Sequence, residues 1–359
     1  MSQQILATKR KTELSVLNVV LCLLVIFIHV SAEPVTKFAP NSIQHILVFV
    51  PWRLGSFVVQ GFIFLSGIKF CLNTPEKFSY KRFYLKRIIA VVVPYIIFNV
   101  IYYLYFVSRE YFPFVLGDLA KYIFTGTLVA PFYFVVVIIQ FYALAPLWRW
   151  MVKKVNATAA LVFSAVLTMF ILIYFAGIIT PIFPNSAGAY AASFFGTYLF
   201  YWILGCYAGY NYEKFKAAVL KNRLHITIIF CIAAAVNAIL SYLSHTGMFQ
   251  GYYLESIHYV FRISAVVFVY TTILSIHQSR ELKNRLITGI DNSSYYIYLV
   301  HSLLIFILDD NMNQWGLEPV GLRYLIRIVV VYTLSILIAM LIRLVTKKSK
   351  QLLLGRRRA

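Results

Sequence analysis

Charged residues are scarce in this sequence of 359 residues, where they make up 13% against 61% hydrophobic residues. A soluble domain usually carries about 25% charged residues, which cover the surface that it turns to water. The small number of charges therefore excludes a soluble globular enzyme. The high apolar content also excludes a disordered chain, because disorder depends on low hydrophobicity. The composition is that of a protein that crosses the bilayer many times.

Cysteine pairs and nucleotide-binding motifs are missing as well. No two cysteines have the spacing of a metal site or a redox pair, and a disulfide scaffold is excluded. The four fall within apolar stretches and are expected to be small buried side chains: Cys22, Cys71, Cys206 and Cys231. The sequence has no Walker loop, dinucleotide fingerprint, His/Glu metal pair or nucleophile elbow. We therefore expect no metal site and no bound cofactor.

The apolar stretches are the main feature that is present. Each is longer than the roughly 9–11 residues of a membrane β-strand, and lengths of about 17–24 residues suit helices that cross a hydrocarbon core near 30 Å. They predict ten spans, at about 14–32, 54–72, 88–106, 132–148, 158–179, 188–210, 224–243, 259–277, 293–309 and 322–345.

Acidic residues are few, 12 against 33 Lys and Arg, which gives a net charge of +21. Cytoplasmic loops of membrane proteins concentrate Lys and Arg. Between the predicted spans, 24 basic residues lie in loops and tails on one side and five on the other. This alternation predicts an all-α polytopic protein of the cytoplasmic membrane, with about ten transmembrane helices and both termini cytoplasmic. It also accounts for the charge without a nucleic-acid partner.

Polar residues inside the spans are the candidates for chemistry, because ionisable groups at membrane depth are costly and usually face a cavity or a partner. His29 lies in the first span, about 22 Å along the helix from Leu14. Asn18 precedes it by eleven residues and so lies near the same face. A neutral imidazole in a cavity suits general base catalysis near pH 7. A histidine hydrogen-bonded to a neighbouring helix or to headgroups fits the position equally.

Two other spans contain ionisable residues. His301 lies in the middle of the ninth span, where a buried packing histidine is the favoured interpretation. Glu255, His258 and Arg262 share one face at the start of the eighth span. They form either an ion pair that caps the helix or a substrate-binding patch at its outer mouth.

The segment from Tyr80 to Arg87, between the second and third spans, has four cations and three aromatic residues in eight positions. It either shows the basic bias of cytoplasmic loops, with contact to anionic lipids, or docks a phosphate-bearing cytosolic donor. The four cations are Lys81, Arg82, Lys86 and Arg87.

Other unusual residues in the spans have structural interpretations. Arg327 lies near a helix end, where a long side chain can reach the headgroups. Gly61, Ser66 and Gly67 are small residues in the second span, and we expect them to let helices approach closely.

Several segments are distinctive in their order along the chain: the first span with His29, FIFLSG (62–67), LKRIIAVVVPY (85–95), FYFVVVIIQFYALAP (132–146) and SSYYIYLVH (293–301). Together they resemble the acyltransferase-3 family of integral membrane acyltransferases over nearly the whole chain. Within that family, ELSVLNVVLC (13–22), VVVIIQFY (135–142) and LGCYAGYNYEKF (204–215) are most similar to the O-succinyltransferases of intercellular adhesion systems, which make poly-N-acetylglucosamine.

The resemblance implies one transmembrane acyltransferase domain over residues 1–359, with short basic tails, and implies that His29 is the catalytic residue. There is one departure. The family usually has an arginine, implicated in catalysis or donor handling, eleven residues before this histidine, and here the position holds Asn18. The expected donor-binding residues are therefore Asn18 and the four cations of residues 80–87.

We thus expect an O-acyltransferase that moves an acetyl or succinyl group from cytosolic acyl-CoA, its co-substrate, to a hydroxyl of a cell-envelope glycan or lipid-linked sugar. His29 is the expected base, and an acyl-imidazole on His29 is a second route. Glu255, His258 and Arg262 are the expected acceptor-binding residues. Two other classes fit the same polar spans: a glycan exporter or flippase, and a non-catalytic membrane partner of a polysaccharide synthase.

Overall fold

The computed structural model describes residues 11–72, 78–249, 251, 254–279 and 284–355, and within them all regular structure is helical, as predicted. The first part of the chain forms α1 (Thr12–Val30), α2 (Ala32–Lys37), α3 (Ile43–Leu54), η1 (Gly55–Phe57), α4 (Val58–Leu72), α5 (Tyr80–Arg87), η2 (Ile88–Val92), α6 (Val93–Ser108), α7 (Leu116–Thr125), η3 (Ala130–Phe132), α8 (Tyr133–Ala143), α9 (Ala145–Lys154) and α10 (Ala157–Ile179). The second part forms α11 (Ala187–Ala192), η4 (Phe195–Tyr198), α12 (Leu199–Tyr210), α13 (Tyr212–Lys221), α14 (Arg223–His245), α15 (Leu254–Ser279), α16 (Arg285–Gln314) and α17 (Val320–Gly355).

Seven helical stretches of the described chain are long and apolar enough to cross a membrane: Thr12–Lys37, Ile43–Leu72, Tyr80–Ser108, Ala157–Ile179, Arg223–His245, Leu254–Gln278 and Val320–Lys347. The helices Leu116–Thr125 and Ala130–Ala143 are bent by 52° and add an eighth stretch if they form one span. The protein is therefore a multi-pass membrane protein with seven to eight candidate spans.

The other predicted spans differ from these stretches for identifiable reasons. The helix predicted at 132–148 ends with α8, because Pro146 lacks the backbone N–H of a helix interior and lies instead in the first turn of α9. The stretch 188–210 is divided into α11, η4 and α12. The stretch 293–309 lies within α16, which is long enough but includes Asp291, Asp309 and Asp310. The count of ten spans stays a prediction.

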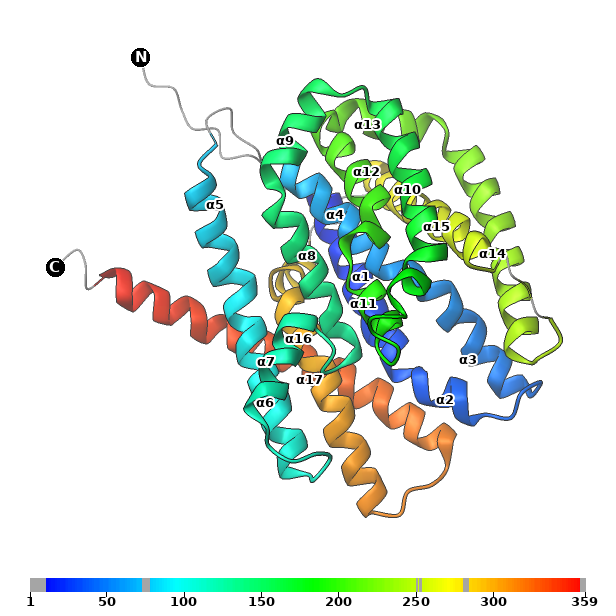
Figure 1. Cartoon of the computed structure of the whole chain (residues 1–359), viewed down its shortest axis with the longest axis vertical. Helices are drawn as coiled ribbons and strands as arrows, with labels where there is room; N and C mark the ends of the chain where they lie inside the picture. Colours follow the sequence, from blue (N-terminus) through cyan, green and yellow to red (C-terminus); the bar gives the residue numbers. More distant parts are fainter. Residues whose placement is uncertain (1–10, 73–77, 250, 252–253, 280–283, 356–359) are drawn as a thin grey trace.

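The basic segment of residues 80–87 is a helix, not a loop. Ser79 begins α5 by accepting a hydrogen bond from the backbone N–H of Arg82 at 3.3 Å. The chain then continues through η2, a π-helical turn, into α6, with Pro94 in the first turn of α6. The third candidate span therefore starts eight residues earlier than predicted, and Figure 1 shows α5 at the edge of the bundle.

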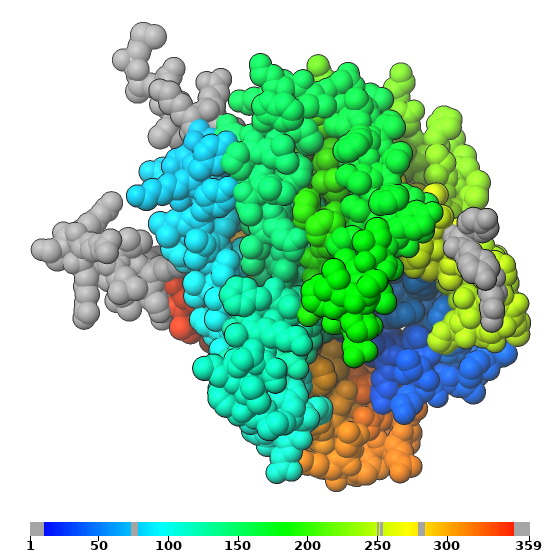
Figure 2. All heavy atoms as spheres, viewed as in Figure 1, coloured from blue at the N-terminus to red at the C-terminus, as the bar shows by residue number. Residues whose placement is uncertain are grey.

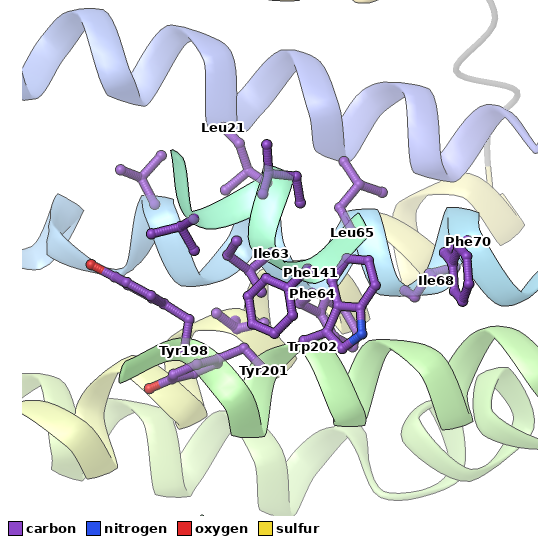
Figure 3. Close-up of a cluster of buried hydrophobic side chains, with 14 of the residues drawn as sticks. Leu21, Ile63, Phe64, Leu65, Ile68, Phe70, Phe141, Tyr198, Tyr201 and Trp202 are labelled. Carbon is purple, nitrogen blue, oxygen red and sulfur yellow. The ribbon is translucent and has the colours of Figure 1, made fainter. Parts of the chain in front are cut away.

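The core of the bundle forms where α4 packs against α12. A Cβ atom on Gly67 would lie 2.6 Å from the Trp202 carbonyl oxygen, and one on Gly205 would lie 2.2 Å from that of Phe64. Only glycine permits this approach, which confirms the expectation for Gly67. Figure 3 shows the aromatic cluster beside the contact, in which Phe141 and Trp202 stack at 4.6 Å.

The two ends of the bundle differ in charge. Figure 1 places α9, α13 and the start of α5 at one end, and α2 with the last turn of α6 at the other. At the first end, Lys11 pairs with Glu213 at 2.7 Å, which lowers the pKa of that carboxyl, and the buried Glu13 accepts a hydrogen bond from Tyr212 at 3.0 Å. The basic helices α9 and α13 and the start of α5 thus lie at one end, and the assignment of that end to the cytoplasm stays a prediction.

Candidate functional site

Two histidines meet where α1 packs against α16. The ring centroids of His29 and His301 are 5.2 Å apart, with 47° between the ring planes. His29 lies in the last turn of α1 and is partly exposed, whereas His301 is fully buried. In the described part of the chain, no group hydrogen-bonds to the His29 ring. Sequence reasoning treated His301 as a separate packing residue and missed this pairing.

The surroundings of His301 hold its ring in one orientation. Its Nδ1–H donates to the Ile297 carbonyl oxygen at 3.2 Å, and the Ser302 hydroxyl donates to Nε2 at 3.2 Å. The Tyr298 ring lies 6.0 Å away, and its hydroxyl donates to the Pro131 carbonyl oxygen. His301 therefore presents a ring of fixed orientation to His29.

Asn18 contacts the same helix at a different level. Its side-chain amide donates to Asp291 Oδ1 at 2.6 Å and to Ser294 Oγ at 2.8 Å. Sequence reasoning missed Asp291, although Asp291, Ser294 and His301 are spaced by three and seven residues, which places polar groups along one helical face. Both Asn18 and His29 thus face α16, as their spacing predicts.

The four cations predicted to bind the donor lie on α5, away from the histidines. Lys81, Arg82 and Lys86 are exposed. The Arg87 guanidinium lies 4.5 Å from the centroid of the Tyr142 ring. Both residues line a groove of about 250 Å³ between α5, η2 and α8.

A contact between η2 and α16 joins this groove to the helices α1 and α16, which hold Asn18 and the two histidines. The Tyr295 hydroxyl donates to the Val91 carbonyl oxygen at 2.7 Å, one helical turn after Arg87. Tyr295 lies in the turn of α16 that holds Asn18, and His301 follows six residues later. At 1.5 Å per residue, this separation along α16 is about 9 Å.

The predicted acceptor residues form a network with two residues from other helices. His258 contacts Glu255 Oε1 through Nδ1 at 3.3 Å, and the Arg53 guanidinium and the Ser241 hydroxyl through Nε2. Arg53 Nε also donates to Ser241 Oγ at 2.9 Å. Arg262 lies 3.8 Å from Glu255 Oε2. In the sequence, Arg53 is one of the five basic residues on the side with few charges, and this pattern does not predict its place in the network.

A polar cavity of about 370 Å³ opens beside this network. Figure 2 shows the surface hollowed between α11 (green) and the segment with α2 and α3 (blue). η1 borders the cavity and also packs on the end of α1, because a Cβ on Gly55 would lie 3.2 Å from Ile28, the residue before His29. The lining residues include Ser56, Gln60, Tyr133, Thr197, Tyr198, Glu255 and Arg262.

Arg327 is part of a buried ion-pair network and does not reach the headgroups as predicted. It is 2% exposed, and its guanidinium pairs with Asp309 at 2.5 Å and with Glu33. Arg323 lies 3.6 Å from the same Glu33. The sequence interpretation was wrong because carboxylates of α2 and α16 lie within reach and make burial of the charge tolerable. The network joins α2, which follows His29, to α16 and α17.

The comparison with known families identifies the chain. The family model for the acyltransferase domain matches residues 12–344. The protein belongs to the acyltransferase-3 family. Among its relatives, a Staphylococcus aureus (strain MSSA476) protein named as a probable poly-beta-1,6-N-acetyl-D-glucosamine export protein is 24% identical over 314 residues, 83% of each chain. A Bacillus subtilis (strain 168) protein named "Putative membrane-bound acyltransferase" is 26% identical over 260 residues, 70% of this chain and 68% of its own. No solved structure matches the chain.

The candidate site residues of this acyltransferase-3 protein lie in three separate sets. The histidines form one set at the α1–α16 contact, and the network of Glu255 and His258 forms a second set beside the polar cavity. The cations of α5 form a third set, which the structure does not bring to His29. Asn18, at the position where the resemblance leads us to expect an arginine, is bound to Asp291.

Proposed function

We propose that this protein is a membrane O-acyltransferase that moves an acetyl or succinyl group from cytosolic acyl-CoA to a hydroxyl of a cell-envelope glycan or lipid-linked sugar. The observation that carries the proposal is the His29 ring, which lies against the ring of His301 and has no hydrogen-bond partner in the described chain. A ring nitrogen of His29 is therefore available to accept a proton. Membership of the acyltransferase-3 family supports the reaction class.

In the proposed reaction, His29 takes the proton of the acceptor hydroxyl as its oxygen attacks the thioester carbonyl carbon. The carbon–sulfur bond breaks, and the CoA sulfur leaves with the proton that His29 returns. In the second route, a ring nitrogen of His29 attacks the thioester first and carries the acyl group to the hydroxyl. His301 holds the orientation of its neighbour in both routes.

We propose that the phosphates of CoA bind the cations of α5 and that Asn18 lies beside the path of the donor. Lys81, Arg82, Lys86 and Arg87 supply positive charge, and the guanidinium suits phosphate. The contact of Tyr295 with η2 supports a donor arm that runs along α16, about 9 Å to His301.

We also propose ten membrane crossings with both termini cytoplasmic. Loop-charge alternation and the grouping of basic segments at one end of the bundle support this topology. A cysteine at Ser186, between α10 and α11, should then react with an impermeant reagent in intact cells, and one at Lys216 should be protected. The reverse pattern would overturn the topology.

A glycan exporter is the second candidate function, because relatives of this chain are named as export proteins. Liposomes that contain the purified protein, labelled acyl-CoA and a glycan acceptor separate the candidates. Covalent label on the glycan supports the transferase, and transfer of unlabelled glycan across the bilayer supports the exporter. If neither occurs unless a polysaccharide synthase is added, a non-catalytic partner is supported.

A further inference from the structure

The polar cavity beside α15 has an aromatic wall. Tyr133 of α8 and Tyr198 of η4 both line it, and their rings are stacked with centroids 6.4 Å apart and 21° between planes. Figure 3 shows Tyr198 and Tyr201 pointing to the same side, away from Trp202. Tyr201 is 1% exposed, and its hydroxyl has no hydrogen-bond partner in the described residues. The cavity lining therefore includes two flat aromatic rings, and the unpaired Tyr201 hydroxyl belongs to a neighbouring residue that does not line the cavity.

The lining of the same cavity also offers a hydrogen-bond donor and an acceptor side by side. The Arg262 Nε is buried and has no partner among the described groups. The nearest carboxylate oxygen to its guanidinium, Glu255 Oε2, lies 3.8 Å from the terminal nitrogen, which is longer than a hydrogen bond. A ligand hydroxyl can accept from Arg262 and donate to Glu255 at the same time.

The charges beside the cavity have both signs, because Glu255 is a carboxylate and Arg262 and Arg53 are guanidinium groups. A carboxylate or phosphate placed near Arg262 would meet the Glu255 carboxylate, and an ammonium group would meet Arg262 and Arg53. A hydroxyl avoids both conflicts, because it is uncharged and has both hydrogen-bonding functions.

Contacts from other helices position Glu255. Its Oε1 is bound by His258 Nδ1, whose other nitrogen is held by Arg53 and Ser241. The chain of contacts joins α3, α14 and α15, and so fixes the carboxylate that faces the cavity. Arg53 and His258 are therefore positioning residues for Glu255.

We infer that this cavity is a subsite for a neutral saccharide ring, with Tyr133 and Tyr198 as the stacking wall and Glu255 and Arg262 as the pair that binds its hydroxyls. The inference rests on the proposed function, because the ring would belong to the acceptor glycan. The packing of η1 on Ile28 places the subsite next to the end of α1 that carries His29.

Binding to the full-length protein in nanodiscs tests the subsite without any acyl transfer. The probes are three short oligosaccharides of equal length: neutral tri-N-acetylchitotriose, cationic chitotriose and anionic trigalacturonate. We expect the neutral probe to bind tightest, and Tyr198→Leu to weaken it about tenfold through loss of ring stacking. Tyr198→Phe should keep the binding of the wild type, and Tyr174→Leu, at a tyrosine that is 54% exposed on α10, should not change it.

Two results would overturn the inference. One is tighter binding of the anionic or cationic probe, and the other is equal binding of the neutral probe by Tyr198→Leu in a protein with unchanged thermal stability.

Kinetics separate this inference from the proposed function. We expect His258→Ala to raise the KM for the acceptor by a larger factor than it lowers kcat, and His258→Gln to recover part of the affinity. If label transfer occurs but Tyr198→Leu keeps the acceptor KM of the wild type, the subsite is wrong and the transferase stands. If no label is transferred but neutral saccharide binding still depends on Tyr198, the subsite stands and the transferase fails.

Discussion

The contact between α1 and α16 has two polar ends that are built differently. At one end, the Asn18 amide donates to Asp291 and Ser294 at 2.6 and 2.8 Å. At the other, His29 meets only the ring of His301 at 5.2 Å, and no hydrogen bond to it is formed within the described chain. Buried polar groups are usually paired, so the first end has the form of a structural contact. The partly exposed His29 ring has no such pairing, and ionisable groups at membrane depth usually face a cavity or a partner, so this end is the candidate for contact with a substrate.

The two ends are connected by one rigid geometry. Eleven residues separate Asn18 from His29, about 16 Å along α1, and residue numbers increase in the same direction along both helices, which are therefore parallel. The hydrogen-bonded end fixes the register of α1 against α16, and the register determines where the histidine rings meet. We therefore predict that the Asn18 end controls the register of the two helices and that the His29 end controls the reaction.

The largest expected effect is that of His29→Ala. We expect acyl transfer to fall by about 10²–10⁴-fold, the usual contribution of a general base, because no other described group contacts the acceptor proton in the proposed reaction. Thermal stability should stay close to that of the wild type, since the His29 ring has no hydrogen bond to lose. The measurement is transfer of labelled acyl groups to a glycan acceptor, alongside the melting temperature in detergent. Full activity in a folded His29→Ala protein would refute the mechanism.

His301→Ala should show the opposite pattern. Removal of this ring leaves the Ser302 hydroxyl without its acceptor in a buried position, at a cost of about 1–3 kcal/mol in the free energy of unfolding. Activity should fall only as far as the folded fraction and the orientation of His29 require. His301→Gln, which keeps an acceptor for Ser302, is the matched control. A His301→Ala protein that is fully stable but as inactive as His29→Ala would make His301 a catalytic residue.

These contacts show which parts of the site can be predicted from sequence. The face shared by Asn18 and His29 follows from helical periodicity within one segment, and was predicted. The pairing of His29 with His301, and of Arg327 with Asp309, joins residues more than fifteen positions apart through helix packing. Local periodicity carries no information on which helix lies opposite, so these partners were missed. The helical state of α5 was missed for a different reason. A run of cations between two spans suggests a cytoplasmic loop, and the signal for a helix is a single capping residue, Ser79.

A smaller effect is expected at the structural end of the contact. Asn18→Arg places a cation beside Asp291 in a family position that usually holds arginine. If the family residue serves the donor, this change should lower the KM for acyl-CoA. Asn18→Ala, which removes both hydrogen bonds, should instead reduce stability by about 1–3 kcal/mol. A higher KM for the donor in Asn18→Arg would indicate a pocket shaped around the amide.

The smallest effects are expected at α5, and they test whether the donor approaches from the Asn18 end. Exposed charge pairs contribute up to about 1 kcal/mol each, so Lys86→Gln should raise the KM for acyl-CoA by no more than about fivefold. Arg87→Gln should raise it more, because the Arg87 guanidinium is held against the Tyr142 ring and is already oriented. Both effects should shrink as salt is added, since salt screens exposed charges. Lys121→Gln, at an exposed cation on α7, is the matched control. If Lys86→Gln and Arg87→Gln proteins are correctly inserted and keep the KM of the wild type, α5 has a role only in lipid contact and topology. The donor would then have to reach His29 by a path that does not follow α16.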